Sequence, residues 1–323
     1  MPLKTRYELK LGMATREAFG RALVELGREN PDIMAVDADL SKSTFTHLFA
    51  KEFPERFVSC GIAEANMVGV AAGLASHGKI PFAASFSCFL LNKAFEQLRV
   101  TVAYPNLNVK IVGTHSGISI GEDGPSQMSV EEISLACSLP GFVVLAPADE
   151  VATRALVRAA AEHVGPVFIR TGRPRVPVVY SPDQRFEIGK AIELLDGADV
   201  TLIANGLMVA ECLRAAEILD AEGISARVLD LHTVKPLDRE AIRRAAAETG
   251  AIVVAEEHLV DSGAGVRVAQ AVAELHPCVM EFVGIQNTYA ESGPPEALLE
   301  KYGLTAPHVA AAARRAVARK RGR

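Results

Sequence analysis

The segment from Gly61 to Met67 places one carboxylate, that of Glu64, at the point where a strand-like stretch passes into a helix. Residues 57–60 are strand-like, and the small residues that follow predict a helix over 64–76. The first turn of such a helix lies at the carboxyl end of a strand, where open α/β sheets bind their ligands. The neighbouring Ala and Asn predict that Glu64 is buried, and a buried carboxylate needs a partner or a chemical role. The alternative is an acid that only complements the helix dipole.

Four side chains could together bind an anion such as a phosphate group. They are Arg16, Ser43, His115 and Arg173. The first stands at the start of a predicted helix, and the others lie in loops at strand ends. Arginine forms forked, bidentate contacts with phosphate, and Ser and His can add single donors. Taken one at a time, each arginine is more typical of a surface ion pair.

Residues 114–130 form a long, polar, Gly-rich segment without a helix or strand pattern. A loop of this length directly after a strand is usually functional. Asp123 and Gln127 lie within it and are further candidates for contacts with a substrate or cofactor.

Phe82, Phe86 and Phe89 follow the helix that begins at Glu64. Their spacings of four and three predict one face of a helix. By itself this pattern is more typical of a hydrophobic core than of a platform for a cofactor.

Several phosphate-binding motifs are missing from the sequence. There is no GxxxxGK[ST] loop and no GxGxxG fingerprint. The nearest approach to the Gly-Asp-Gly magnesium-diphosphate motif of thiamine enzymes is Gly121-Glu122-Asp123-Gly124, which has no Asn at the required distance downstream. We therefore expect no metal ligand on this chain, and any cofactor should be held by its phosphates elsewhere.

Helices and strands are expected to alternate along the whole chain, which predicts an α/β protein. The first series has expected helices at 15–27, 64–76, 89–102 and 150–162 and strands at 33–37, 57–60, 80–84, 109–113 and 167–170. The second has expected strands at 200–204, 226–231, 252–256 and 279–283 and helices at 208–221, 238–248, 264–275 and 306–320. Thr15 and Asp149 are the expected caps of two of the helices. The predicted domains are 1–180, with a parallel sheet, and 191–323, which is smaller, with a linker at 181–190.

Composition narrows the class of protein. The chain has 323 residues, a net charge of −5 and 49% hydrophobic residues, as expected for a globular protein of two or three domains. The basic residues cluster only in the tail at 314–323, which we expect to be a frayed, solvated helix end, so nucleic-acid binding is not predicted. Five widely spaced cysteines, a polar N-terminus and short apolar runs predict a cytoplasmic protein that neither enters nor contacts a membrane.

Together these features resemble the C-terminal half of transketolase, which contains its pyrimidine-binding domain and its C-terminal domain. The resemblance covers nearly the full chain. It rests on the segments 15–20, 39–45, 61–67, 121–127, 169–174, 235–238 and 256–258. The diphosphate-binding half of transketolase has no counterpart here, so the chain resembles the second subunit of a split enzyme.

The resemblance implies thiamine diphosphate as cofactor and assigns roles to the candidate residues. Glu64 would hydrogen-bond N1′ of the aminopyrimidine ring and drive its tautomerisation, which makes it the catalytic residue. Phe86 and Phe89 would stack on that ring. The implied clamp for the sugar phosphate is Arg16, Ser43, His115 and Arg173, with Asp123 on a substrate hydroxyl. Gln127 stands near the reacting centre, where many bacterial transketolases have His and animal enzymes have Gln.

The implied reaction moves a two-carbon ketol group from a ketose phosphate to an aldose phosphate. Two other thiamine enzymes share the glutamate: the β-subunit of a 2-oxo-acid dehydrogenase and deoxyxylulose-phosphate synthase. The first has no need for a four-part phosphate clamp, and the second is normally a single chain. The segment 121–128 favours transketolase over both. A non-catalytic interaction subunit is a further alternative, which the intact Glu64 and clamp disfavour.

The resemblance also implies partners. An N-terminal transketolase subunit would hold the diphosphate and a divalent ion such as Mg²⁺, and the enzyme would be an α2β2 heterotetramer. The small residues 69–73 could pack closely against a second copy of the chain or against its own sheet. The sequence does not separate these two possibilities.

Overall fold

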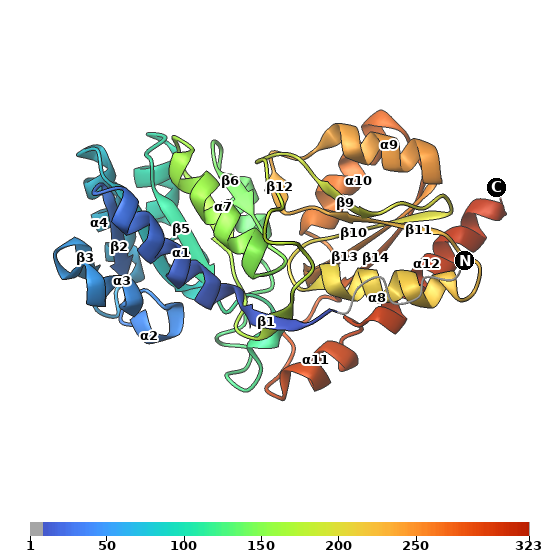
Figure 1. The fold of residues 1–323 in the computed structure, drawn as a ribbon, viewed down its shortest axis with the longest axis horizontal. Coiled ribbons are helices and arrows are strands. Elements are labelled where there is room, and N and C mark those ends of the chain that lie inside the picture. Colours follow the sequence, from blue (N-terminus) through green and yellow to red (C-terminus); the bar gives the residue numbers. More distant parts are fainter. Residues whose placement is uncertain (1–8, 323) are drawn as a thin grey trace.

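The computed structural model describes residues 9–322 and folds them around two large sheets (Figure 1). The first sheet contains β2 (Ile33–Asp37), β3 (Phe57–Ser59), β4 (Ile80–Phe86), β5 (Lys110–Thr114), β6 (Val143–Leu145), β7 (Val167–Arg170) and β12 (Thr233–Lys235). Its order is β12-β6-β7-β5-β4-β2-β3, and every neighbouring pair is parallel except β12 with β6. Every residue of β2 and β5 is buried, as in a parallel sheet covered on both faces.

The second sheet contains β9 (Ile192–Leu195), β10 (Val200–Ala204), β11 (Ala226–Asp230), β13 (Ala251–Leu259) and β14 (Val279–Ile285). Its order is β14-β13-β10-β11-β9, and only β9 is antiparallel to its neighbour. A separate antiparallel pair joins β1 (Leu11–Ala14) to β8 (Arg175–Pro177). The predicted α/β class, with one larger parallel-rich sheet and a second smaller one, is confirmed. The domain boundary near residue 180 stays a prediction.

Helices cover both faces of each sheet. The α-helices of the described residues are α1 (Thr15–Glu29), α2 (Ser41–Thr44), α3 (His47–Glu52), α4 (Glu64–Ser76), α5 (Phe95–Gln97), α6 (Glu132–Ser138), α7 (Glu150–Glu162), α8 (Met208–Asp220), α9 (Arg239–Thr249), α10 (Ala264–Leu275), α11 (Pro295–Lys301) and α12 (Ala306–Arg321). Residues of α1 and α7 share one hydrophobic cluster of the first sheet, and residues of α4 belong to another. In Figure 1, α9 and α10 lie above the second sheet, whereas α8 and α12 lie below it.

The two predicted helix caps have different outcomes. Asp149 caps α7 as expected, since its Oδ1 accepts the amide of Ala152 at 2.8 Å. Thr15 does not cap α1, because it is already the first helical residue. Its hydroxyl instead accepts the amide of Gly172 at 2.8 Å, which ties the start of α1 to the loop after β7.

The continuous helix predicted over 89–102 is broken into three segments. Phe89–Lys93 (η2) and Leu98–Ala103 (η3) are wide π-helical turns, and α5 lies between them. Phe82 and Phe86 belong to β4 rather than to a helix, so the predicted helical face of three phenylalanines is wrong. An i, i+4 pair also shares one face of a strand, which is why the spacing misled. π-Turns are often found at functional sites.

The second half of the chain contributes to the first sheet through β12, which no sequence pattern predicted. Thr233 pairs with Leu145 of β6. The ammonium of Lys235 donates to the carbonyls of Leu139 at 2.6 Å and Cys137 at 3.0 Å. Because β12 has only three residues, it carries no readable periodicity.

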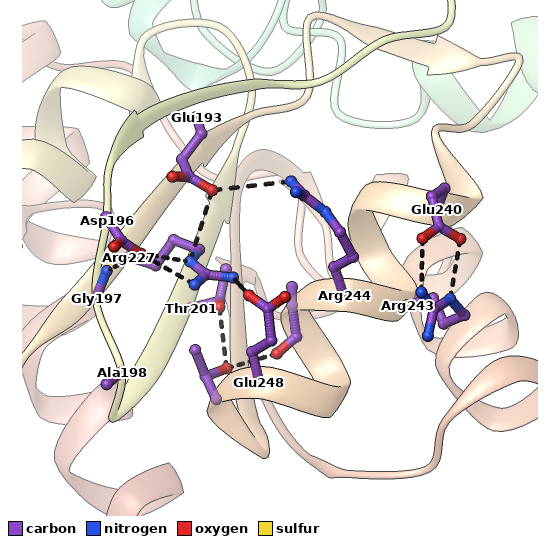
Figure 2. Close-up of polar contacts among 12 residues, drawn as sticks. Glu193, Asp196, Gly197, Ala198, Thr201, Arg227, Glu240, Arg243, Arg244 and Glu248 are labelled. Carbon is purple, nitrogen blue, oxygen red and sulfur yellow. Dashed lines mark hydrogen bonds and ion pairs between the residues drawn. The ribbon is translucent and has the colours of Figure 1, made fainter.

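A cluster of ion pairs ties the edge strand β9 to the rest of the second sheet (Figure 2). Arg227 of β11 donates to Asp196 at 3.0 Å and to Glu248 of α9 at 2.5 Å. Its Nε also lies 3.7 Å from Glu193 of β9. One guanidinium therefore joins a strand, a loop and a helix, which is a structural role.

The basic tail is not the frayed end that composition predicted. Arg314 pairs with Glu222, and Arg315 pairs with Glu281 at 3.0 Å. The ammonium of Lys320 donates to the carbonyls of Asp199 and Thr249 at 2.7 and 2.9 Å. These contacts hold α12 against the second sheet. None of the helices in the described part of the chain is long and apolar enough to cross a bilayer.

Candidate active site

Glu64 is the first residue of α4 and follows the carboxyl end of β3. As expected, it is buried, with 5% of its surface exposed. The ammonium of Lys93 lies 3.5 Å from each of its carboxylate oxygens. Because the Lys93 side chain is 53% exposed, water screens this pair and little free energy is needed to open it. The carboxylate also lies in the first turn of α4, where the helix dipole favours it.

Lys93 links this carboxylate to a stacked pair of aromatic rings. Phe86 ends β4 and Phe89 begins η2. Their ring centroids are 5.5 Å apart and their planes differ by 10°. The ammonium of Lys93 is 4.4 Å from the centre of the Phe89 ring, so one lysine contacts both the ring and Glu64.

Arg16 is the centre of a second group. Its Nη1 donates to the carbonyl of Ser43 at 2.8 Å and lies 3.2 Å from Nε2 of His115. Its Nε donates to the carbonyl of Arg173 at 3.3 Å. The structure thus brings together all four residues expected to bind an anion. The contact with Ser43 is through the backbone, and the role of the Ser43 hydroxyl stays a prediction.

The charges in this group favour an anion between them. Burial lowers the pKa of Arg16, and the nearby charge of Arg173 lowers it further. The carboxylates of Glu17 and Asp123 oppose that shift but do not reverse it. A phosphate or another anion between the two guanidiniums would relieve their repulsion and satisfy their donors.

His115 is buried and neutral in this arrangement. Its Nδ1 lies 2.8 Å from the hydroxyl of Thr114, which in turn donates to the carbonyl of Ser85 at 3.2 Å. Because an arginine can only donate, Nε2 of His115 must accept from Arg16, and the network assigns the ring proton to Nδ1. Burial, with the charges of Arg16 and Arg173, lowers the pKa of His115 to about 3. The sequence predicted His115 as a donor to the anion, whereas here Nε2 accepts.

The aromatic pair and the cationic group are continuous. The rings of Phe86 and His115 stack with centroids 3.8 Å apart. A path of contacts therefore runs from Glu64 through Lys93 and the aromatic rings to Arg16.

Two acceptors hold the guanidinium of Arg173. Its Nη1 donates to the carbonyl of Ile120 and lies 3.0 Å from a carboxylate oxygen of Glu122. The side chain of Glu122 is 63% exposed, so an incoming anion can replace it at little cost.

Asp123 and Gln127 form no hydrogen bond with this group among the described residues. Asp123 is exposed, and its charge acts on Arg16. Gln127 is half-buried, and its side-chain oxygen accepts the hydroxyl of Ser126 at 2.5 Å. Their roles toward a substrate or cofactor stay predictions.

Three residues of the site were not predicted from the sequence. Lys93 follows Phe89 by four residues, a helical spacing that could have indicated the contact. Thr114 precedes His115 directly and could have been considered as its partner. Phe45, whose ring lies 5.3 Å from the guanidinium of Arg16, has no pattern that would have indicated it.

Within residues 9–322, no group of three or more His, Cys, Asp or Glu side chains is arranged to hold a metal ion. The arrangement combines a buried carboxylate, a stacked aromatic face and an anion-binding group in one continuous site. Such a site can move a proton at a ring nitrogen and hold a molecule with a charged end.

Family models match both parts of the chain. Residues 12–178 match the transketolase pyrimidine-binding domain, and residues 189–309 match the transketolase C-terminal domain. The chain belongs to the transketolase family. The predicted resemblance to the C-terminal half of transketolase is therefore confirmed.

Transketolase relatives of similar length are named as separate subunits. The chain is 42% identical to a 6-deoxy-6-sulfo-D-fructose transketolase subunit of Clostridium, over 94% of this chain and 95% of that one. It is 41% identical to one of the subunits of an apulose-4-phosphate transketolase from Phocaeicola vulgatus, over 90% and 94%. A solved split-gene transketolase, described as an inactive β4 tetramer, superposes with a TM-score of 0.90 at 52% identity. That alignment covers 96% of this chain and 100% of the other.

Proposed function

We propose that this chain is the C-terminal subunit of a thiamine-diphosphate-dependent transketolase, active only together with an N-terminal subunit. It would transfer a two-carbon ketol group from a ketose phosphate to an aldose phosphate. The observation that carries this proposal is that Lys93 contacts both Glu64 and the Phe89 ring, which places the carboxylate close to the stacked rings that lead to Arg16. The family membership supports it.

The residues present suit thiamine diphosphate. When bound, this cofactor supplies a carbon centre that attacks a carbonyl and accepts the electrons of the breaking carbon–carbon bond. Glu64 would hold and release a proton at N1′ of the aminopyrimidine ring, at a site shielded from water. Phe86 and Phe89 would orient that ring by stacking. We further propose that Gln127 lies against the cofactor.

Lys93 lies where such a ring would bind. A ring that stacks on Phe89 and hydrogen-bonds Glu64 needs the space in which the ammonium now contacts both. We therefore propose that Lys93 swings toward solvent when the cofactor binds. Its exposure makes this movement inexpensive.

The anion-binding group would fix the far end of the sugar, with Asp123 on a substrate hydroxyl. Two relatives are named for sugars that carry a sulfo group or a phosphate. Both groups present tetrahedrally arranged oxygens to Arg16 and Arg173, so the clamp recognises the anion rather than the rest of the sugar. The site thus supports a sugar with an anionic end as the substrate class.

The N-terminal partner subunit would hold the diphosphate and Mg²⁺ or another divalent ion. We propose an α2β2 assembly with a contact between two copies of this chain at α4. Gly69 and Gly73 are exposed, and a Cβ added at either would meet nothing within 4 Å. They therefore do not pack on their own sheet. The description of a related split-gene subunit as a β4 tetramer is consistent with such self-association. The cytoplasmic location stays a prediction.

Reconstitution tests the proposal. The purified chain alone should show no ketol transfer, and addition of an N-terminal transketolase subunit should give transfer from xylulose 5-phosphate to ribose 5-phosphate. If the pair forms but is inactive on every ketose phosphate or sulfo-ketose offered, the chain is a non-catalytic interaction subunit and the proposal fails.

A further inference from the structure

The loop at 114–130, which carries three candidate site residues, is held by the second sheet. The amide of Ser119 donates to Oε1 of Glu257 at 2.7 Å. Farther along the loop, the carbonyl of Val130 accepts the amide of Leu259 at 2.9 Å. Glu257 and Leu259, which make these two contacts, both lie at the end of β13. One strand of the C-terminal half therefore holds the loop near its start and at its end.

The carboxylate of Glu257 is fixed from its other side. Glu257 is 2% exposed, and its Oε2 accepts from Nη2 of Arg170 at 3.2 Å. The same Nη2 donates to the carbonyl of Glu257 at 2.9 Å. Arg170 is itself buried and paired through Nε with Glu132 at 2.6 Å. Glu257 is thus oriented by β7 of the first sheet and has one oxygen left for the loop.

The loop is shaped to receive this carboxylate. Gly117 has a φ of +82°, and a Cβ added there would lie 2.0 Å from the carboxyl carbon of Glu257. Only a residue without a side chain permits that approach and that backbone conformation. Gly117 therefore allows the loop backbone to lie directly against the carboxylate of Glu257.

The loop in turn holds the anion-binding group. Ile120, the residue after Ser119, offers its carbonyl to Nη1 of Arg173. His115 stands near the start of the same loop and contacts Arg16. A shift of the backbone at 119–120 would move the acceptor that places the guanidinium of Arg173.

We propose that Glu257, in the C-terminal half of the chain, is a positioning residue for the anion-binding group. It fixes the backbone at Ser119 and, through the carbonyl of Ile120, the guanidinium of Arg173. This inference gives the C-terminal half a part in substrate selection. Only the part that concerns substrate selection rests on the proposed function.

Glu257→Gln tests the inference, with Glu256→Gln as a matched control. A glutamine cannot accept from both Ser119 and Arg170, because its amide nitrogen would face one of these donors. Glu256 is equally buried on the same strand, but it accepts the amides of Ala264 and Gly265 at 2.8 Å, at the start of α10. Both variants replace one buried carboxyl group with an amide, and only Glu257 faces the loop.

Hydrogen–deuterium exchange of the purified chain gives a readout that needs no activity. Glu257→Gln should speed exchange in 117–121 about tenfold, which corresponds to about 1.4 kcal/mol. Glu256→Gln should leave this segment unchanged and speed exchange at 264–266. Unchanged exchange at 117–121 in both Glu257→Gln and Glu257→Asp would overturn the inference.

Substrate binding gives the second readout. In the reconstituted enzyme, Glu257→Gln should raise KM for xylulose 5-phosphate about tenfold and change KM for unphosphorylated hydroxypyruvate less than twofold. Equal changes for both donors would contradict positioning of the anion-binding group. If no ketol transfer is found at all, binding of inorganic phosphate to the purified chain, measured by calorimetry, replaces KM. Phosphate affinity that Glu257→Gln leaves unchanged would then overturn the inference.

A second variant covers the case in which Glu257→Gln fails to fold. Glu257→Asp keeps the buried charge for Arg170 but withdraws the carboxylate from Ser119 by about 1.5 Å, the length of one carbon–carbon bond. It should show the same exchange and phosphate-binding changes. A Glu257→Asp chain that matches the wild type in both would contradict the inference.

Discussion

The titration of His115 is the most quantitative prediction of the site. The folded chain holds this ring neutral, because Nε2 accepts from Arg16 and burial lowers the pKa to about 3. In the unfolded chain, an ordinary histidine has a pKa of about 6.5. Between these values the unfolded chain binds more protons, so this residue's stabilising contribution is complete above pH 6.5 and is lost as the pH falls toward 3. The loss between pH 8 and pH 5 is about 2 kcal/mol.

Two measurements check this value. The imidazole nitrogen signals of His115, assigned in NMR spectra by their loss in His115→Gln, should not titrate between pH 8 and pH 5. They should also show the proton on Nδ1. In urea denaturation, lowering the pH from 8 to 5 should reduce the free energy of unfolding by about 2 kcal/mol more in the wild type than in His115→Gln.

Glutamine is a suitable control because its side-chain oxygen can accept from Arg16 without titrating. A His115 signal that titrates near pH 6.5 would refute the assigned contact with Arg16. Equal pH dependence of stability in the two proteins would refute the energetic argument.

Three other predictions concern the fold, the cofactor and the anion. Asp149→Ala should destabilise the chain by about 3 kcal/mol in urea denaturation, because the carboxylate of Asp149 accepts three buried backbone amides. Asp238 is a helix cap that accepts only two amides, so Asp238→Ala is the control. A destabilisation by Asp149→Ala no larger than that by Asp238→Ala would contradict this prediction. Lys93→Met should tighten thiamine diphosphate binding in the reconstituted enzyme up to about fivefold, since the competing ion pair is lost; weaker binding in calorimetry would show that Lys93 assists the cofactor. Arg173→Ala should raise KM for xylulose 5-phosphate at least about tenfold while sparing hydroxypyruvate, and equal losses for both donors would remove Arg173 from the clamp.

The sequence predicted those parts of the fold and site that depend on local pattern. Helix α4 and strand β10 have the predicted bounds, because a run of small helix-forming residues marks the first and a short apolar run of strand length marks the second. The proximity of His115 and Arg173 could be expected, since loops at the carboxyl ends of parallel strands meet at one edge of the sheet.

Features that depend on contacts distant in sequence could not be predicted. The three residues of β12 become a strand only because β6 offers an edge. The π-turn at Phe89–Lys93 has ordinary helical composition, so nothing in it marks the wider turn that brings Lys93 to Glu64. Glu257 follows another buried glutamate on a strand, and only the fold shows which of the two faces the loop.

The central claim is that Glu64 is one half of an active site that is completed by a second chain. Exchange of the C2 proton of thiamine diphosphate, followed by NMR in a mixture of this chain and an N-terminal transketolase subunit, tests it most directly. The wild-type chain should accelerate this exchange strongly only when both subunits are present, and Glu64→Gln should abolish the acceleration while the two subunits still assemble. Exchange that is equally fast with Glu64→Gln would contradict the account.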